Sequence, residues 1–259
     1  MTLASLPEKL ESYYFSIKKN RWHWLFQLGC RILLAYAFIV AGMVKILGER
    51  FASGLSVIHP MGSYLEALHH TGYYYTFIGV AQVLAAILLL ISRTVLMGAL
   101  LYLPIIVNIW ILSFAVRFVG SYVTSPLMVL ANLYILAWHY DKLRYILPFN
   151  QYSKEVSFAK PVKYDKKFPF LFFAGVASTM VFTVLYSFFG HEVMPQNSLK
   201  SCNAQFENTE NREAGSEFCE CVHTIGNPLD TCLERFDQLK TSIHYLSRSP
   251  LHQEIALII

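Results

Sequence analysis

Five long hydrophobic runs alternate with short polar stretches along this chain. They cover residues 22–47, 75–91, 95–115, 122–140 and 168–189. Each run is close to the length of about 20 apolar residues with which a helix crosses a hydrocarbon core. Ser92, Arg93 and Thr94 alone separate the second run from the third, so these two helices must be antiparallel neighbours. The pattern predicts an all-α membrane protein with a four-helix transmembrane bundle and a fifth transmembrane helix.

The distribution of charge predicts which side each loop occupies. Residues 142–167 carry seven Lys and Arg against two acidic residues, whereas residues 190–259 carry ten Asp and Glu against five basic residues. Lys and Arg are enriched in cytoplasmic loops. We therefore expect a cytoplasmic N-terminus and an outer C-terminal tail. With five membrane spans in the chain, lipid is the expected contact of the basic loop and nucleic acid is disfavoured.

The runs and charges together divide the chain into five segments. These are a cytoplasmic N-terminus, a four-helix bundle, a basic cytoplasmic loop, a fifth membrane helix and an outer tail, over residues 1–21, 22–141, 142–167, 168–189 and 190–259.

The tail is predicted to be a small module stapled by disulfides. Four of the five cysteines lie there, namely Cys202, Cys219, Cys221 and Cys232. Bonding Cys219 to Cys221 would close a strained small ring. Two pairings remain open, Cys202–Cys219 with Cys221–Cys232, or Cys202–Cys221 with Cys219–Cys232. A metal or redox site at the Cys-x-Cys motif is the alternative, and Cys30, inside a span, should be a free thiol.

Apolar residues recur at helical spacing in the tail and predict its small core. A Gly226-Asn227-Pro228 break separates two expected short helices. The expected core positions are Phe218, Val222, Ile225, Leu229, Leu233, Phe236 and Leu239.

Polar residues inside the spans are the candidate ligand-binding set. Lys45, Gln82, Asn108 and Asn132 come from four different spans, and a rise of about 1.5 Å per residue places them at overlapping depths. Facing inward, they would line a polar pocket in the outer half of the bundle. Three alternatives stay open: hydrogen bonds that only join helices, a Lys45 side chain that extends to water, and an ion pathway.

Arg31 and Asp141 are candidate structural charges. An Arg within hydrocarbon costs at least about 2.5 kcal/mol, so Arg31 needs a partner. We expect it to pair with Asp141 or to bond helix-end carbonyls at the inner face.

The outer loop between the first two spans, residues 48–72, contains His59, His69 and His70. It is expected to lie in the membrane interface or to cover the pocket. Adjacent histidines on a helix point about 100° apart, so no metal site is predicted there.

Three stretches resemble DoxX-like membrane proteins. Arg31–Lys45 resembles the family's first helix, Gly79–Gly98 its second helix and the start of its third, and Leu130–Asp141 its fourth. The resemblance covers about residues 25–145 and implies a four-helix core. The fifth span and the cysteine tail lie outside it. The expected location is a bacterial inner membrane, and the charge and cysteine distribution put the tail in the periplasm. For a few members the resemblance also implies a subunit of a membrane oxidoreductase linked to quinone. Gln82 stands where many relatives have Glu, and Gln cannot supply a carboxylate.

Two functions follow from these observations. One is a membrane subunit of a redox complex with a pocket for a diffusible quinone, and the other is a non-enzymatic scaffold whose tail docks a membrane or periplasmic partner protein. A transporter is disfavoured because no inverted repeat is visible. No haem, dinucleotide or nucleotide fingerprint occurs, so no covalent cofactor is expected and no reaction is assigned.

Overall fold

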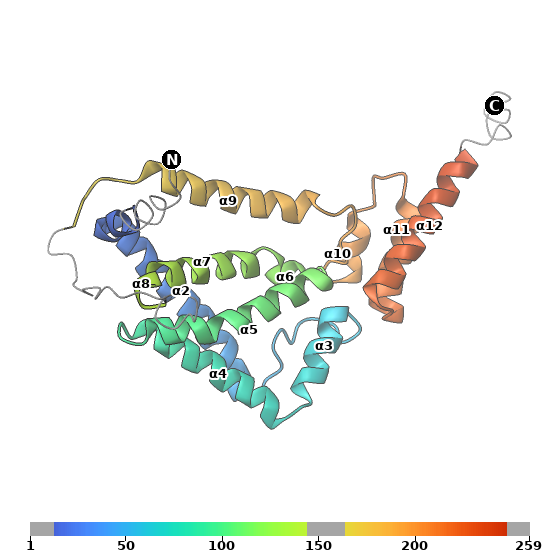
Figure 1. The fold of residues 1–259 in the computed structure, drawn as a ribbon. Helices are drawn as coiled ribbons and strands as arrows, with labels where there is room; N and C mark the ends of the chain where they lie inside the picture. Colours follow the sequence, from blue (N-terminus) through green and yellow to red (C-terminus); the bar gives the residue numbers. More distant parts are fainter. Residues whose placement is uncertain (1–12, 144–163, 248–259) are drawn as a thin grey trace, which may run out of the picture.

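The computed structural model describes residues 13–143 and 164–247. Five of its helices are long and apolar enough to cross a membrane. Four of these spans form a bundle: α2 (Arg21–Ile46), α4 (Tyr73–Leu90), α5 (Val95–Ala115), and the span Val119–Trp138, most of which is α7 (Thr124–Trp138). The fifth is α9 (Phe170–Phe189). The predicted all-α membrane fold is confirmed (Figure 1).

The four bundle helices form a closed ring. α2 packs against α4 and α7, and α5 packs against the same two helices, so α2 and α5 face each other across the ring. The short helix α6 (Val119–Tyr122) joins α5 to α7, and α8 (Tyr140–Leu143) follows α7. The short connection between α4 and α5 makes these two helices antiparallel, as predicted from the pattern of runs.

Two glycines allow α2 and α4 to approach closely. A Cβ built on Gly42 of α2 would lie 2.7 Å from the carbonyl oxygen of Gly79 on α4, and a Cβ on Gly79 would lie 2.7 Å from the Gly42 oxygen. Both distances are too short for a real side chain. Small residues at such contacts let two backbones approach, which gains van der Waals contact that lipid cannot supply.

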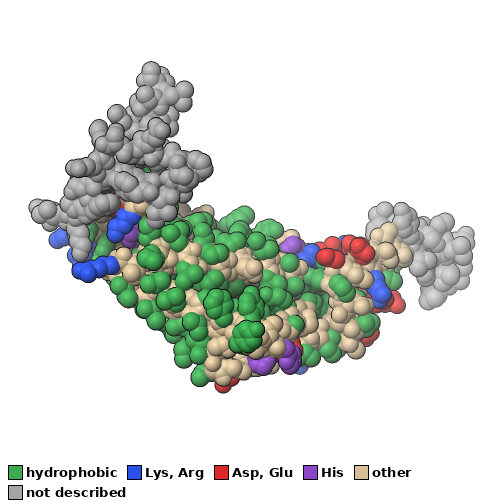
Figure 2. Space-filling view, turned by 60° about the horizontal axis from the view of Figure 1, so that its bottom comes forward, with side chains coloured by type: hydrophobic (Ala, Val, Ile, Leu, Met, Phe, Trp, Pro, Cys, Tyr) green, Lys and Arg blue, Asp and Glu red, His purple; other side chains and the backbone are tan. Residues whose placement is uncertain are grey.

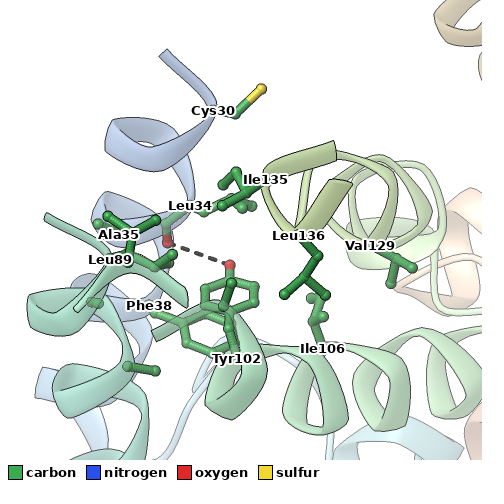
Figure 3. Close-up of a cluster of buried hydrophobic side chains, with 14 residues drawn as sticks. Cys30, Leu34, Ala35, Phe38, Leu89, Tyr102, Ile106, Val129, Ile135 and Leu136 are labelled. Atoms are coloured by element: carbon green, nitrogen blue, oxygen red, sulfur yellow. Dashed lines mark hydrogen bonds between the residues drawn. The ribbon is translucent and has the colours of Figure 1, made fainter. Parts of the chain in front are cut away.

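Aromatic stacking fills the centre of the ring (Figure 3). The rings of Phe38 on α2 and Tyr102 on α5 are stacked with centroids 3.5 Å apart. The Tyr102 hydroxyl donates to the carbonyl oxygen of Leu34 at 3.3 Å, which satisfies its polar group within the apolar core. Ile106 and Ile135 complete the layer from α5 and α7.

α9 lies beside the bundle, along α7 (Figure 1). Its first turn is attached by ring contacts from Phe172 to Phe26 and Tyr134. The chain before it is also joined to the start of α2, because the Arg21 N–H donates to the Asp165 carbonyl oxygen at 2.9 Å. None of its membrane-crossing window is buried, so its sides are left to lipid.

The C-terminal module contains α10 (Leu199–Ala204), α11 (Arg212–Glu220), the π-turn η1 (Cys221–Ile225) and α12 (Leu229–Ser247). Disulfides join Cys202 to Cys219 and Cys221 to Cys232. The prediction of a stapled tail is confirmed, with the first of the two open pairings. These bridges connect α10 to α11 and η1 to α12, around a core that includes Phe206, Phe218, Val222 and Phe236.

One expected core position of the module is wrong. Ile225 is 62% exposed, although helical spacing from Phe218 and Val222 placed it inside. The last turn is a π-turn, and Gly226 follows it in the left-handed conformation at φ +77°. A π-turn rotates each later residue less than an α-helix does, so Ile225 leaves the buried face.

The surface matches a protein that crosses a membrane. Figure 2 shows apolar side chains over the middle of the molecule, Lys and Arg at one end, and Asp and Glu near the C-terminal module. Most of the predicted basic loop, including the cations between residues 144 and 163, lies outside the described residues.

Candidate functional site

Lys45 lies in the last turn of α2 and is buried. Its Nζ donates to the carbonyl oxygen of Ala41, one turn back on the same helix, at 3.0 Å. The ammonium also lies 4.5 Å from the ring centroid of Phe51 and 5.9 Å from that of Tyr75. Aromatic faces attract a cation in this range. The outer loop, through Phe51, therefore covers Lys45.

Gln82 lies on the face of α4 that meets α2 and is 1% exposed. The Gly42–Gly79 contact and the bond from Arg31 to Leu89 fix the register of this antiparallel pair. In that register Gln82 lies opposite about residue 39, so Lys45 lies about 9 Å further toward the outer end. The two side chains share a helix interface at different depths.

Asn108 does not join the expected pocket. It is exposed, on the side of α5 that points away from the ring. Ile106, two residues earlier, is 1% exposed. Two residues of helix correspond to a rotation of about 200°, so Asn108 faces away from the ring. The close contact of Gly98 with Ala85 and Leu89 also places Asn108 about 6 Å nearer than Gln82 to the end of the bundle that carries Lys45.

Asn132 is fully buried in α7 and joins two helices. Its Nδ2 donates to the carbonyl oxygen of Ala99 on α5 at 3.0 Å. The structure therefore brings Lys45, Gln82 and Asn132 inside the bundle at three depths, and leaves Asn108 outside it.

Arg31 bonds the carbonyls at the end of a neighbouring helix. Its Nε donates to the Leu89 oxygen at 2.7 Å and its Nη2 donates to the Leu90 oxygen at 2.8 Å. These oxygens lie in the last turn of α4, where carbonyls lack an intrahelical partner. A cation there also meets the negative end of the helix dipole. Of the two partners expected for Arg31, the carbonyls are the ones that the structure provides.

Asp141 has other partners. Its carboxylate forms an ion pair with Lys18 at 2.8 Å and accepts a hydrogen bond from the Tyr14 hydroxyl at 3.0 Å. These contacts hold the chain before α2 against the end of α7.

Several buried polar atoms of the bundle have no hydrogen-bond partner among the described residues. Two are acceptors, Gln82 Oε1 and Asn132 Oδ1, one is the donor Trp110 Nε1, and one is the Ser125 hydroxyl. Such a group costs free energy of about 1–3 kcal/mol when it stays unpaired. These atoms are where water or a polar ligand would bind inside the bundle.

Sequence reasoning missed a second polar site, at the outer end of the bundle. Residues 191–196, which we call the connector, follow α9 and lead into the C-terminal module. From the bundle, Arg117 Nη1 donates to the Val193 carbonyl oxygen at 2.8 Å. The Tyr122 hydroxyl is 2.6 Å from His191 Nε2. The sequence gives only a weak signal for it, the placement of Arg117 and Tyr122 beyond the end of a span.

Two histidines also bind the connector. His59 Nε2 is 3.0 Å from the Gln196 carbonyl oxygen, and His223 Nε2 is 2.6 Å from the Pro195 oxygen. His59 precedes α3 (Pro60–His69) in the outer loop, and His223 belongs to η1 of the module. Their ring centroids are 5.5 Å apart. The outer loop and the module thus meet at the connector.

His59 is neutral in this arrangement. Its Nδ1 accepts a hydrogen bond from the Met61 N–H at 3.1 Å and so caps α3. The ring is 0% exposed. Burial first and the neighbouring His223 second lower the pKa of His59 from 6.5 to about 4, against the opposing effect of the Gln196 carbonyl.

The described residues contain no group of three or more His, Cys, Asp or Glu that could hold a metal ion. Cys219 and Cys221 bond to different partners, Cys202 and Cys232. The Cys-x-Cys motif is therefore a pair of structural half-cystines in this fold.

Comparison with known proteins finds one kind of relative. The protein YwoB of Bacillus subtilis (strain 168), described as uncharacterized, is 33% identical to the chain over 126 residues, which are 47% of the chain and 80% of YwoB. No family model matches the chain. No solved structure matches it.

Proposed function

We propose that this chain, which belongs to the same protein family as YwoB of Bacillus subtilis, is a non-enzymatic membrane scaffold whose C-terminal module docks a partner protein. The observation that carries the proposal is the connector. Side chains from the outer loop, the bundle and the module all bond it. A module that served only as a loose tail would not need a fixed orientation on the bundle.

The face of the module offered to a partner is acidic. Glu213, Glu217 and Glu220 are exposed on α11, and their spacing of four and three residues puts them on one side of the helix. Complementary charge speeds and orients protein association. The expected partner is a membrane or periplasmic protein with a basic surface.

The orientation is part of the proposal. Lys18 and Lys142 lie at the end of the bundle opposite the connector, together with Arg93, Lys166 and Lys167. Under the positive-inside rule this end is cytoplasmic. The chain is then a multi-pass protein of a bacterial inner membrane with its module in the periplasm. A reporter active only in the cytoplasm should work after residue 155 and stay silent after residue 259, and the reverse would refute this orientation.

A second function is favoured by the unpaired polar atoms of the bundle. If the bundle is DoxX-like, as the sequence resemblance suggests, it could serve a quinone-linked redox complex. Gln82 Oε1 and Asn132 Oδ1 are acceptors, so they suit the hydroxyls of a quinol better than the carbonyls of a quinone. Lys45 is a weak candidate for the head group, because its ammonium is already bonded to Ala41 and covered by Phe51.

One purification separates the two functions. The protein is extracted in mild detergent, and its co-purifying proteins and lipid-soluble molecules are identified by mass spectrometry. The scaffold predicts a partner that is lost from a variant with Glu213, Glu217 and Glu220 changed to Gln. The control changes three exposed acids of α12, Asp230, Glu234 and Asp237, to their amides and should keep the partner. A quinol without any partner would favour the second function.

A further inference from the structure

The face of α5 that points away from the ring carries a polar side chain, Asn108, for which the described residues provide no hydrogen-bond partner. The Asn108 side chain is exposed and makes no hydrogen bond among the described residues. It lies three residues from the middle of the Val95–Ala115 span, so its depth is within about 5 Å of the membrane centre. An amide at that depth meets hydrocarbon, where an unmade hydrogen bond is costly.

The surrounding face is a continuous stripe. Its members are all exposed and follow a repeat of three and four residues: Met97, Leu100, Pro104, Asn108, Ile111 and Ala115. This stripe, the α5 face, lies opposite Tyr102, which points across the ring at α2. α9 lies on the far side of the bundle, along α7. The other described helices therefore leave the α5 face open.

A second polar group lies on the same face. Pro104 has no N–H, so the carbonyl of Leu100, four residues earlier, loses its intrahelical donor. Leu100 and Asn108 are two turns apart on one side of α5. On this lipid-facing stripe, the Leu100 carbonyl therefore lacks its intrahelical donor, and the Asn108 amide lacks a hydrogen-bond partner among the described residues. A neighbouring helix in the membrane can supply such partners.

We propose that the α5 face is the contact between two copies of this chain, with Asn108 bonded to Asn108 of the second copy. A carboxamide has one acceptor oxygen and two donor hydrogens, so it is complementary to itself. In a dimer with its two-fold axis along the membrane normal, the two α5 helices run parallel and residue 108 meets residue 108 at equal depth. No other partner is guaranteed to present an amide at this depth.

Cross-linking in native membranes tests the contact directly. Asn108→Cys is made in a Cys30→Ser background, since Cys30 is the free cysteine of the described residues and the tail cysteines are bonded. The matched control is Phe77→Cys. Phe77 is 62% exposed on α4, and the contact of Gly98 with Leu89 and Ala85 sets it at the depth of Asn108. Mild oxidation should give a covalent dimer from Asn108→Cys and little from Phe77→Cys.

The role of the Asn108 amide is tested by measuring the monomer–dimer equilibrium in bilayers. Asn108→Leu replaces the amide with an apolar side chain that hydrocarbon accommodates but that cannot form the hydrogen bond. It should weaken dimerisation in bilayers by about 3-fold to 30-fold, which corresponds to the loss of a membrane hydrogen bond of about 0.6–2 kcal/mol. Asn108→Gln retains the amide and should dimerise like the original chain. Equal cross-linking at positions 108 and 77, an adduct with the mass of another protein, or unchanged dimerisation of Asn108→Leu would each overturn the proposal.

Discussion

Acid should release α3 from the connector through His59. This side chain holds both contacts only as a neutral imidazole, because Nδ1 accepts from the Met61 N–H while Nε2 donates to the Gln196 oxygen. Protonation would place an N–H at Nδ1 against the N–H of Met61. It would also place a positive charge beside the ring of His223, whose centroid is 5.5 Å away.

The pKa shift gives the size and the direction of the effect. The pKa of His59 is about 4 when folded, because of burial first and of His223 second, and 6.5 when the site is open. The open state therefore binds the proton between these two values, and the closed state loses stability as pH falls from 6.5 to 4. At 1.36 kcal/mol per pH unit, the loss is about 3 kcal/mol. Above pH 6.5 and below pH 4 this contribution is constant.

Hydrogen exchange of peptides that cover α3 measures this opening. With the protein in lipid nanodiscs, and after correction for intrinsic exchange, protection should fall about 100-fold from pH 6.5 to pH 4.5, two units of full slope. His59→Asn supplies a capping oxygen that does not titrate and should remove most of the dependence. It also controls for His191, whose pKa is likewise lowered by burial and by Arg117. Equal pH dependence in both proteins would refute the reasoning.

Three further perturbations test other contacts. Arg31→Leu leaves two helix-end carbonyls unpaired and should lower stability in detergent melting by about 2–3 kcal/mol. The control Arg93→Leu changes an exposed side chain and should have little effect, so equal melting of both variants would contradict the carbonyl contact. Replacing Cys221 and Cys232 with Ser removes the bridge that closes a loop with a sequence separation of 11. This change should destabilise the module by about 3 kcal/mol in a urea titration of the full chain, and an unchanged unfolding midpoint would argue against this bridge. Non-reducing peptide mapping should find one alkylatable thiol, Cys30, and free thiols in the module would show that the staples are absent.

The membrane fold could be predicted from the sequence because hydrocarbon imposes a length and a composition on every span. The third run was expected over residues 95–115 and α5 covers Val95–Ala115. The disulfide pairing could be narrowed by ring strain at Cys219-Glu220-Cys221, but its final choice depends on how α10 folds back on α11, which is tertiary geometry.

The predicted pocket shows that the depth of a residue along a helix does not give the direction of its side chain. Depth along a helix follows from residue number, whereas the direction of a side chain depends on which face packs inward, and α5 is apolar on all sides. The Asn108 side chain therefore points away from the ring, a direction that its position along the helix could not predict. The connector was missed for another reason. Apart from the Tyr122–His191 contact, the bonds described for it are to backbone oxygens of Val193, Pro195 and Gln196. Backbone acceptors leave no trace in the sequence.

The fixed docking of the C-terminal module on the bundle is tested most directly by a distance between the two. Spin labels at Tyr64→Cys on α3 and Glu217→Cys on α11, both exposed sites, in a Cys30→Ser background, report it in nanodiscs at pH 7.5. The account predicts a single narrow distance distribution that broadens when Arg117 and His223 are replaced by Leu and Gln, because these side chains hold the connector. A broad distribution in the otherwise unaltered protein would contradict it.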